Sequence, residues 1–457
     1  MKYLLNPYLI TLRTNHGELW YNPLNQKIIL LTNSDIRKIK ANHIDKNLTD
    51  LLFFIKSKNT ETQEELQDRI ANILVSAFNL KPDIEVLYLI LTEKCNLRCK
   101  YCFVERGDIS THFMSEKIIE QSLRLFAELA KNSERPVICP YGGEPLLNAR
   151  GFSFLLRKVR EYKESGILAK NTVISLVTNG TLVKKNINLL NNPDLDLAIS
   201  LDGPPKVNDK MRVYSNNLGS SKASIGAIRL LNKESIPFGI SCTLTPYNTP
   251  ILSDVASYFI EELKCKRICF NLPITSDIFR LDPYYATLKM IEAYEVIKKS
   301  GGTEDRMSRI IRPLINGGFK LYDCAGCGGQ IVVTPDAKIG PCQAFLSKKE
   351  GHFEDFGLTR KNPKEVAYKI LNSELFNRWA QKAAILNKAC KYCKFVSLCG
   401  GGCPAFVEQN KLQKDVRWCT YVRNATNWIL KELAKDSKTE PAKKFEGDIN
   451  YRPLNPF

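Results

Sequence analysis

The stretch "LTEKCNLRCKYCFVERG", residues 91–107, places cysteines at positions 95, 99 and 102. It follows directly on the apolar run at 86–91, so the cysteines stand on a loop just past an expected strand. Three thiols cannot all pair as disulfides, and they are one short of a closed four-ligand metal site. The loop therefore predicts a metal centre with one open coordination position.

Composition limits the setting of this centre. With 457 residues, 44% of them hydrophobic, the chain is long enough for two or three domains with buried cores. It has no signal-peptide pattern and no stretch apolar enough to cross a bilayer, so we expect a cytoplasmic protein. In that reducing setting its 15 cysteines indicate metal, redox or core use rather than disulfides. The four histidines (16, 43, 112 and 352) are not in metal-ligand spacing with the cysteines, so metal is expected to bind through sulfur.

The net charge of +18 would attract a nucleic acid, an anionic membrane or an acidic peptide. The basic residues are dispersed along the chain and form no arginine patch interleaved with aromatic residues. A solvated basic surface is the alternative explanation. We expect neither nucleic acid nor membrane as a partner.

The pattern of apolar residues divides the chain into four regions. Residues 1–84 read as a small α+β domain: a β-hairpin around the turn at 22–25, then helices at 34–40 and 63–78. Residues 85–300 alternate amphipathic helices, such as 115–132, with strands at 86–91, 137–140, 173–177, 195–200, 238–243 and 267–271. This α/β alternation predicts a parallel sheet folded as a partial (β/α)6 TIM-like barrel. Residues 301–425 form a Cys-rich domain, and the charged tail, 426–457, is expected to be poorly ordered or docked on the surface.

Unusual residues fall at the ends of all six predicted strands. The three-cysteine loop follows the first strand, and "YGGEP", "TNGT", "SLDGP" and "TPYN" follow the next four; Asn271 ends the sixth. In parallel barrels the loops at the C-terminal strand ends converge on one mouth. The six motifs therefore predict a single active site.

The three thiolates can hold a 4Fe-4S cluster in which one iron keeps an open position for substrate or cofactor. The alternatives are a zinc ion completed by a distant residue and three buried thiols. The pattern Cys95-x3-Cys99-x-Tyr101-Cys102 resembles the signature of radical S-adenosylmethionine (radical SAM) enzymes. The resemblance implies that the open iron binds SAM, that the reduced cluster cleaves it to a 5'-deoxyadenosyl radical, and that this radical abstracts hydrogen from a substrate.

The same resemblance implies a SAM pocket at the strand ends. Gly142, Gly143 and Glu144 match the segment that receives the methionine amino group, since glycines permit close approach and a carboxylate suits an ammonium. Ser200 and Arg212 match positions that hold the ribose and the methionine carboxylate. Tyr101 is also expected at the pocket, together with Thr178 and Asn179, for which a plain turn is the alternative.

A second set of cysteines follows the barrel. Cys390-x2-Cys393-x5-Cys399-x3-Cys403, then Cys419, could bind zinc on its own. Behind a three-cysteine barrel it resembles the SPASM extension, which implies two auxiliary 4Fe-4S clusters and three in all. One would use Cys324, Cys327, Cys342 and Cys403, and the other Cys390, Cys393, Cys399 and Cys419. The chain departs from the family pattern at Ala337, where a glycine is usual, and in the close spacing of Cys324 and Cys327. The remaining cysteines, 139, 242, 265 and 269, are expected in the core.

SPASM-bearing radical SAM enzymes mostly modify peptides, and residues 1–84 resemble the domain with which ribosomal-peptide (RiPP) maturases capture a precursor's leader. We therefore predict an oxidoreductase that forms a carbon-carbon or thioether cross-link in such a peptide and draws electrons from a flavodoxin- or ferredoxin-type donor. A lid packed on the barrel is the alternative role for residues 1–84. The alternative functions are an anaerobic sulfatase-maturase-like, formylglycine-generating enzyme and a non-enzymatic zinc or electron-transfer protein.

Overall fold

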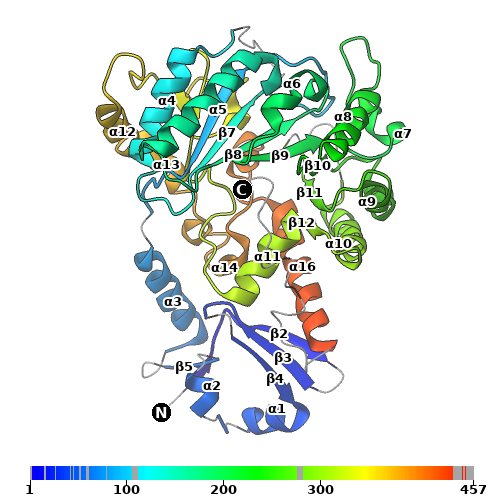
Figure 1. Ribbon diagram of the computed structural model, residues 1–457. Coiled ribbons are helices and arrows are strands. Elements are labelled where there is room, and N and C mark those ends of the chain that lie inside the picture. The colour runs from blue at the N-terminus through cyan, green and yellow to red at the C-terminus, as the bar shows by residue number, and fades with distance from the viewer. Residues whose placement is uncertain are drawn as a thin grey trace.

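The structure is a computed structural model. It describes residues 3–14, 17–25, 27–41, 43–44, 46–50, 53–57, 61–78, 80–104, 112–274 and 281–435, together with Phe445 and Asp448. Within these ranges the chain forms an N-terminal sheet, a large parallel sheet covered by helices, and a Cys-rich region between them (Figure 1).

The N-terminal region contains the predicted hairpin. Strands β2 (Ile10–Thr14), β3 (Gly17–Asn22) and β4 (Lys27–Thr32) form an antiparallel sheet in the order β2-β3-β4, and β1 (Tyr3–Leu5) pairs with β5 (Phe54–Lys56). Helices α1 (Asn33–Lys40), α2 (Lys46–Asp50) and α3 (Gln63–Ala77) complete it. A capping box at Thr62 begins α3: its hydroxyl accepts from the Glu65 N–H, and the Glu65 carboxylate accepts from the Thr62 N–H.

This region packs against the Cys-rich region. Tyr8 and Leu66 lie in one buried cluster with Ile385 and Val396. The Tyr8 hydroxyl donates a 2.7 Å hydrogen bond to the Lys391 carbonyl. Strand β2 also lies against helix α16, at the far end of the molecule from the barrel helices (Figure 1). The contacts therefore place this region beside the second cysteine set.

All six predicted barrel strands are present and parallel. They are β6 (Val86–Thr92), β7 (Val137–Gly142), β8 (Val173–Thr178), β9 (Leu195–Ser200), β10 (Gly239–Thr243) and β11 (Arg267–Asn271). Every residue of β6 is buried, as expected for a strand covered on both faces. The sheet is therefore the predicted partial barrel, and its strands all end at one edge.

The sheet extends beyond the six predicted strands at both ends. Strand β12 (Thr303–Glu304) pairs parallel with β11, and β13 (Gln330–Val333) pairs parallel with β6 and antiparallel with β14 (Ile339–Gly340). With these three strands the barrel sheet has nine described strands, in the order β12-β11-β10-β9-β8-β7-β6-β13-β14. Because β13 joins β6, the Cys-rich region is hydrogen-bonded directly to the strand that precedes the three-cysteine loop.

Helices cover the outside of the barrel sheet (Figure 1). The barrel helices are α4 (Glu116–Leu129), α5 (Ala149–Glu164), α6 (Val183–Leu190), α7 (Pro205–Asn208), α8 (Ser221–Lys233), α9 (Leu252–Glu261) and α10 (Pro283–Lys299), with the short 3-10 helices η1 (Pro145–Asn148) and η2 (Thr249–Ile251). The following region contains α11 (Asp305–Asn316), η3 (Gln343–Phe345), α12 (Pro363–Leu371), α13 (Glu374–Ala380), η4 (Ala384–Leu386), α14 (Val396–Cys399), α15 (Pro404–Gln409) and α16 (Val416–Lys435). No described helix combines the length and apolarity that a bilayer span requires.

The start of the predicted tail is helical, since α16 continues through Lys435. Beyond it Phe445 and Asp448 are buried. The Asp448 carboxylate accepts hydrogen bonds from the Tyr294 hydroxyl (2.6 Å) and the Ser308 hydroxyl (2.8 Å). The tail is thus docked on α10 and α11 at these residues.

Candidate active site

A cavity of about 330 Å³ opens at the C-terminal edge of the barrel strands. Every residue predicted from the sequence to bind the first cluster or SAM lines it. They are Cys95, Cys99, Tyr101, Cys102, Gly142, Gly143, Glu144, Thr178, Asn179, Ser200 and Arg212. Three cysteines of the Cys-rich region, Cys324, Cys342 and Cys403, line the same cavity. Parallel pairing explains the convergence, because it brings all the strand ends to one side.

The thiols of the three-cysteine loop receive N–H groups from the surrounding chain. The Leu97 amide donates to Cys95 Sγ at 3.4 Å, and Asn179 Nδ2 lies 3.9 Å from the same sulfur. Arg212 Nη1 lies 4.0 Å from Cys99 Sγ. Burial raises the pKa of the Cys95 thiol to about 12. Because a thiol must lose its proton to bind metal, metal binding at Cys95 would release a proton.

Gly142 and Gly143 let two loops lie against each other. The Gly143 amide donates to the Thr92 carbonyl (3.0 Å) and the Glu144 amide to the Lys94 carbonyl (2.9 Å). A Cβ on Gly142, whose φ is +131°, would lie 1.9 Å from the Thr92 oxygen, and one on Gly143 would lie 2.2 Å from the Lys94 oxygen. The glycines therefore set the position of the three-cysteine loop, a role that the sequence did not reveal.

Gly142→Ala is expected to destabilise the protein by at least about 2 kcal/mol, because the new Cβ meets backbone at an unfavourable φ. Thermal unfolding of the reconstituted protein measures the loss. Gly226→Ala on α8 is the matched control: its Cβ meets nothing within 4 Å, and alanine is the better helix former. Equal stability of Gly142→Ala and wild type would contradict the close-approach role.

Glu144 is a buried carboxylate that already has partners. Its Oε1 accepts from the Thr178 hydroxyl (2.7 Å) and the Leu146 amide (3.1 Å), and its Oε2 accepts from the Asn179 amide (2.8 Å). Burial raises its pKa, and these three hydrogen bonds oppose the rise. The side chain thus ties the end of β7 to the end of β8, while it remains on the cavity wall, where an ammonium group could still approach.

The loop after β8 is more than a plain turn. Asn179 Nδ2 donates to Asn96 Oδ1 at 2.9 Å, and Asn96 Nδ2 donates to the Thr181 hydroxyl at 2.7 Å. These bonds join "TNGT" to the three-cysteine loop. By contrast, "TPYN", residues 245–248, does not line the cavity. Its Asn248 Nδ2 donates to the carbonyls of Asp202 and Thr243, and these bonds support the cavity wall from the side away from the cavity.

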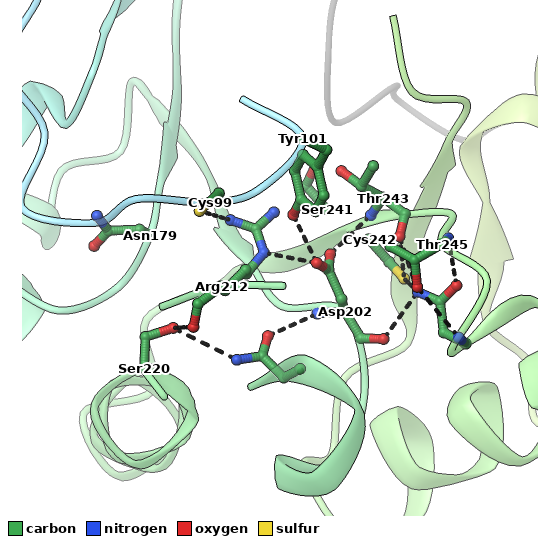
Figure 2. Close-up of polar contacts among 12 residues, drawn as sticks. Cys99, Tyr101, Asn179, Asp202, Arg212, Ser220, Ser241, Cys242, Thr243 and Thr245 are labelled. Atoms are coloured by element: carbon green, nitrogen blue, oxygen red, sulfur yellow. Dashed lines mark hydrogen bonds and ion pairs between the residues drawn. The ribbon is translucent and has the colours of Figure 1, made fainter. Parts of the chain in front are cut away.

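Asp202 is the centre of a polar network that the sequence analysis did not single out (Figure 2). Its Oδ2 accepts from the Tyr101 hydroxyl at 2.6 Å and lies 3.1 Å from Arg212 Nε; its Oδ1 accepts from the Thr243 amide at 3.0 Å. The side chain is almost fully buried. Its position in "SLDGP", two residues past the end of a strand, was the available signal.

Arg212 is held by this network beside the first cysteines. The guanidinium lies 5.4 Å from the centre of the Tyr101 ring, as well as close to Cys99 and Asp202. Burial works to lower its pKa, but the carboxylate of Asp202, with Tyr101 and Cys99 nearby, outweighs burial and raises the pKa well above the usual value. Arg212 is therefore a permanent cation on the cavity wall, suited to a carboxylate ligand.

The structure brings one group of later cysteines together beside the cavity. Burial raises the pKa values of Cys327 and Cys342, and the nearby thiols of Cys324 and Cys403 raise both further. The Cys327 amide donates to the Cys324 carbonyl at 3.1 Å, so the short spacing between these two residues forms a tight turn. All four thiols are thus neighbours, the grouping that the resemblance implies.

The other four cysteines gather farther from the cavity. A hydrogen bond between the Cys399 and Cys419 thiols raises the pKa of Cys399 and lowers that of Cys419 to about 7. Burial raises the pKa of Cys390 to about 11, and Cys419 and Cys393 add to this rise. None of these four thiols lines the cavity.

Two other expectations concern the turn at Ala337 and the cysteines that are not assigned to a cluster. Ala337 adopts a φ of +63° in the turn between β13 and β14, where its amide donates to the Thr334 carbonyl. The turn therefore forms with alanine in the conformation that glycine adopts without strain. The cysteines at 139, 242, 265 and 269 are buried in the core, as predicted.

The three thiols of the loop suit an iron-sulfur cluster, since a 4Fe-4S cluster takes one thiolate on each iron. A parallel partial barrel with three thiols and a buried arginine at its mouth is the arrangement expected of a SAM-dependent iron-sulfur enzyme.

Comparisons with known proteins agree with this class. Residues 89–252 match the radical SAM superfamily. An uncharacterized protein of Methanocaldococcus jannaschii is 30% identical over 187 residues, which span 41% of this chain and 62% of that protein. The radical SAM cyclopropyl synthase TigE of Paramaledivibacter caminithermalis is 22% identical over 83% of this chain and 79% of its own. A cysteine-type anaerobic sulfatase-maturating enzyme of Clostridium novyi is 24% identical over 70% of this chain and 87% of its own.

Solved structures share the fold. Streptococcus suis SuiB bound to its precursor peptide SuiA superimposes with a TM-score of 0.56 over 90% of this chain and 98% of SuiB, at 17% identity. The enzyme anSMEcpe with bound AdoMet superimposes with a TM-score of 0.64 over 78% of this chain and 99% of its own, at 18% identity. Residues 89–252 therefore form a radical SAM domain, and the chain is similar to radical SAM enzymes such as TigE and the anaerobic sulfatase-maturating enzymes. A radical SAM domain implies a 4Fe-4S cluster and SAM as cofactors.

Proposed function

We propose that this enzyme is a peptide maturase that forms a carbon-carbon or thioether cross-link in a ribosomally made precursor peptide. One observation carries the proposal: a single cavity is lined both by the three-cysteine loop and by Cys324, Cys342 and Cys403. When bound, the first cluster and SAM supply a 5'-deoxyadenosyl radical that abstracts hydrogen from the substrate. Closing a cross-link leaves one surplus electron, for which the later cysteines would hold two auxiliary clusters, one beside the cavity and one farther from it.

In this proposal the cavity residues have defined tasks. Cys95, Cys99 and Cys102 hold the first cluster, and Arg212 receives the SAM carboxylate. Glu144 faces the amino group, and Asn179 and Thr178 keep Glu144 in place. Ser200 lies at the end of β9 on the same wall, where its hydroxyl suits the ribose.

The N-terminal sheet supports a peptide substrate. Among the described residues, β4 pairs with β3 alone, so its outer edge is open to an added strand. We propose that the precursor's leader binds there, while its core enters the cavity in a cytoplasmic setting with a flavodoxin- or ferredoxin-type donor. SuiB, which has been solved with its precursor peptide bound, aligns with more of this chain than anSMEcpe does.

The test is co-expression with a short peptide encoded beside the gene, followed by mass spectrometry. We expect the peptide to lose a pair of hydrogen atoms and to fragment as a ring across the cross-linked residues. Co-expression with the Cys99→Ala variant is the control and should leave the mass unchanged. An unmodified peptide with the active enzyme would overturn the proposal.

The second candidate is a formylglycine-generating sulfatase maturase, favoured by the similarity to the Clostridium novyi enzyme. Its product carries an aldehyde, so a hydrazide probe distinguishes it from a cross-link. Labelling of the modified peptide by the probe would favour this candidate.

Leu30→Glu on β4 is expected to weaken leader binding by about tenfold without changing SAM cleavage in the absence of peptide. Leu30 is 41% exposed on the edge strand, where an added strand would cover it. Titration of a labelled leader peptide measures the affinity. Leu218→Glu is the matched control, since Leu218 is also exposed but lies on the barrel. Equal affinities for the two variants would place the leader elsewhere.

A further inference from the structure

Arg306 lines the cavity at the second position of α11, on a wall built by β10, β11 and α11. Its Nη2 donates to Asn271 Oδ1 at 2.8 Å, and Asn271 Nδ2 donates to the Ser241 hydroxyl at 3.0 Å. Asn271 and Ser241 also line the cavity. The hydrogen bond to Ser241 fixes the amide, so the Asn271 oxygen is directed at the guanidinium.

Arg306 differs from the other two arginines of the cavity. Arg212 is paired with Asp202 and Arg417 with Asp415. No ion pair among the described residues includes Arg306, although an arginine has five N–H donors. Among the described residues the guanidinium makes one side-chain hydrogen bond, the bond to Asn271, and it lies 5.7 Å from the centre of the Trp418 ring.

The acidic residues around Arg306 have partners of their own. Asp305 lies 2.8 Å from Arg309, and Asp323 is paired with Lys320. Glu304 caps α11: it accepts from the Met307 amide at 2.7 Å and the Phe270 amide at 3.0 Å. The cation at Arg306 is thus left available to a ligand in the cavity.

We infer that Arg306 binds a carboxylate of the peptide substrate, in the same cavity as the cysteines that flank it. The inference rests on the proposed function and specifies its substrate: an acidic side chain near the attacked residue, or the carboxyl terminus of the peptide. A planar guanidinium binds a carboxylate through two parallel hydrogen bonds, and burial strengthens them. Because Arg212 faces the first cluster, the cavity offers one arginine to SAM and a separate one to the peptide.

The first test uses the reconstituted holoenzyme and the precursor peptide encoded beside the gene. R306Q is expected to raise the KM for this peptide about tenfold or more, because a charged hydrogen-bonded contact is lost. SAM cleavage without peptide should stay at the wild-type rate. The KM of R306K, which keeps the positive charge but cannot form two parallel hydrogen bonds, should lie between the values for wild type and R306Q. Arg157→Gln on the outer face of α5 removes the same charge from an exposed position and should match wild type.

Peptide variants identify the carboxylate. Each acidic residue is changed in turn to its amide, and the carboxyl terminus is amidated separately. One of these changes should raise the wild-type KM as much as R306Q does and have no further effect in R306Q. The inference would be overturned if every change in the peptide raised KM further in R306Q, or if R306Q itself left KM unchanged.

A second measurement does not depend on the precursor. Equilibrium dialysis of N-acetyl Gly-Glu-Gly amide and N-acetyl Gly-Gln-Gly amide against SAM-loaded holoenzyme should show preference for the glutamyl peptide in wild type and no preference in R306Q. If the precursor is unmodified but this preference holds, the proposed function fails and the carboxylate site stands. Lost SAM cleavage in R306Q would assign Arg306 to SAM instead. A shifted auxiliary-cluster potential with unchanged peptide preference would assign it to that cluster.

Discussion

Cys99→Ala is expected to abolish cleavage of SAM, because in the proposed function the first cluster has only three protein ligands and Cys99 is the central one. The loss should be total within detection, measured as 5'-deoxyadenosine released after anaerobic reduction. The later cysteines are separate groups and should still assemble their clusters. Iron should therefore fall from about twelve to about eight atoms per chain, four for each cluster.

Cys265→Ala is the matched control for this experiment. Cys265 is a buried thiol whose Sγ contacts the Arg267 carbonyl at 3.3 Å, away from the cavity. The variant should retain SAM cleavage and full iron content. If Cys99→Ala still cleaves SAM, the catalytic cluster has been assigned to the wrong cysteines. A colourless wild-type protein that holds zinc would refute radical chemistry altogether.

Asp202→Asn is expected to cost about 3 kcal/mol of stability, because it leaves the buried Arg212 guanidinium without its counter-charge. The asparagine also cannot hold the Tyr101 hydroxyl and Arg212 through a shared carboxylate oxygen. We therefore expect SAM affinity to fall by about tenfold or more, since the arginine loses its fixed position. Thermal unfolding and SAM titration measure the two effects.

Asp254→Asn provides the comparison. Asp254 lies on the exposed side of α9 and lines no part of the cavity. Its variant should match wild type in both measurements. Unchanged SAM affinity in Asp202→Asn, with Arg212→Lys equally unaffected, would show that this network supports the fold without binding the cofactor.

The sequence predicted the barrel strands well, because each is a short apolar run with helix-forming sequence on both sides. It did not predict β12, which has only two residues, or β13, whose partner β6 lies more than two hundred residues earlier. Pairing at such separation leaves no local pattern. It nevertheless decides where Cys324 and Cys342 lie, since β13 connects the Cys-rich region to the barrel.

The candidate site also combines local features with long-range ones. The three-cysteine loop could be found from spacing alone, because its cysteines lie within eight residues of one another. Resemblance added Gly142, Glu144 and Arg212, and all lie on the cavity wall. Asp202 and Arg306 were not identified, because their importance comes from partners on other strands and helices.

By itself, then, the sequence determined the barrel strands and the edge at which the motifs collect, and it predicts an open ligand position at Cys95, Cys99 and Cys102. These properties follow from local periodicity and from the parallel direction of the strands. Only the tertiary structure decided that Arg212 and Arg417 are ion-paired while Arg306, among the described residues, is not. It also decided that the three-cysteine loop and the Cys-rich region line one cavity. Ion pairs and cavity walls depend on distances between side chains far apart along the chain, which folding alone establishes.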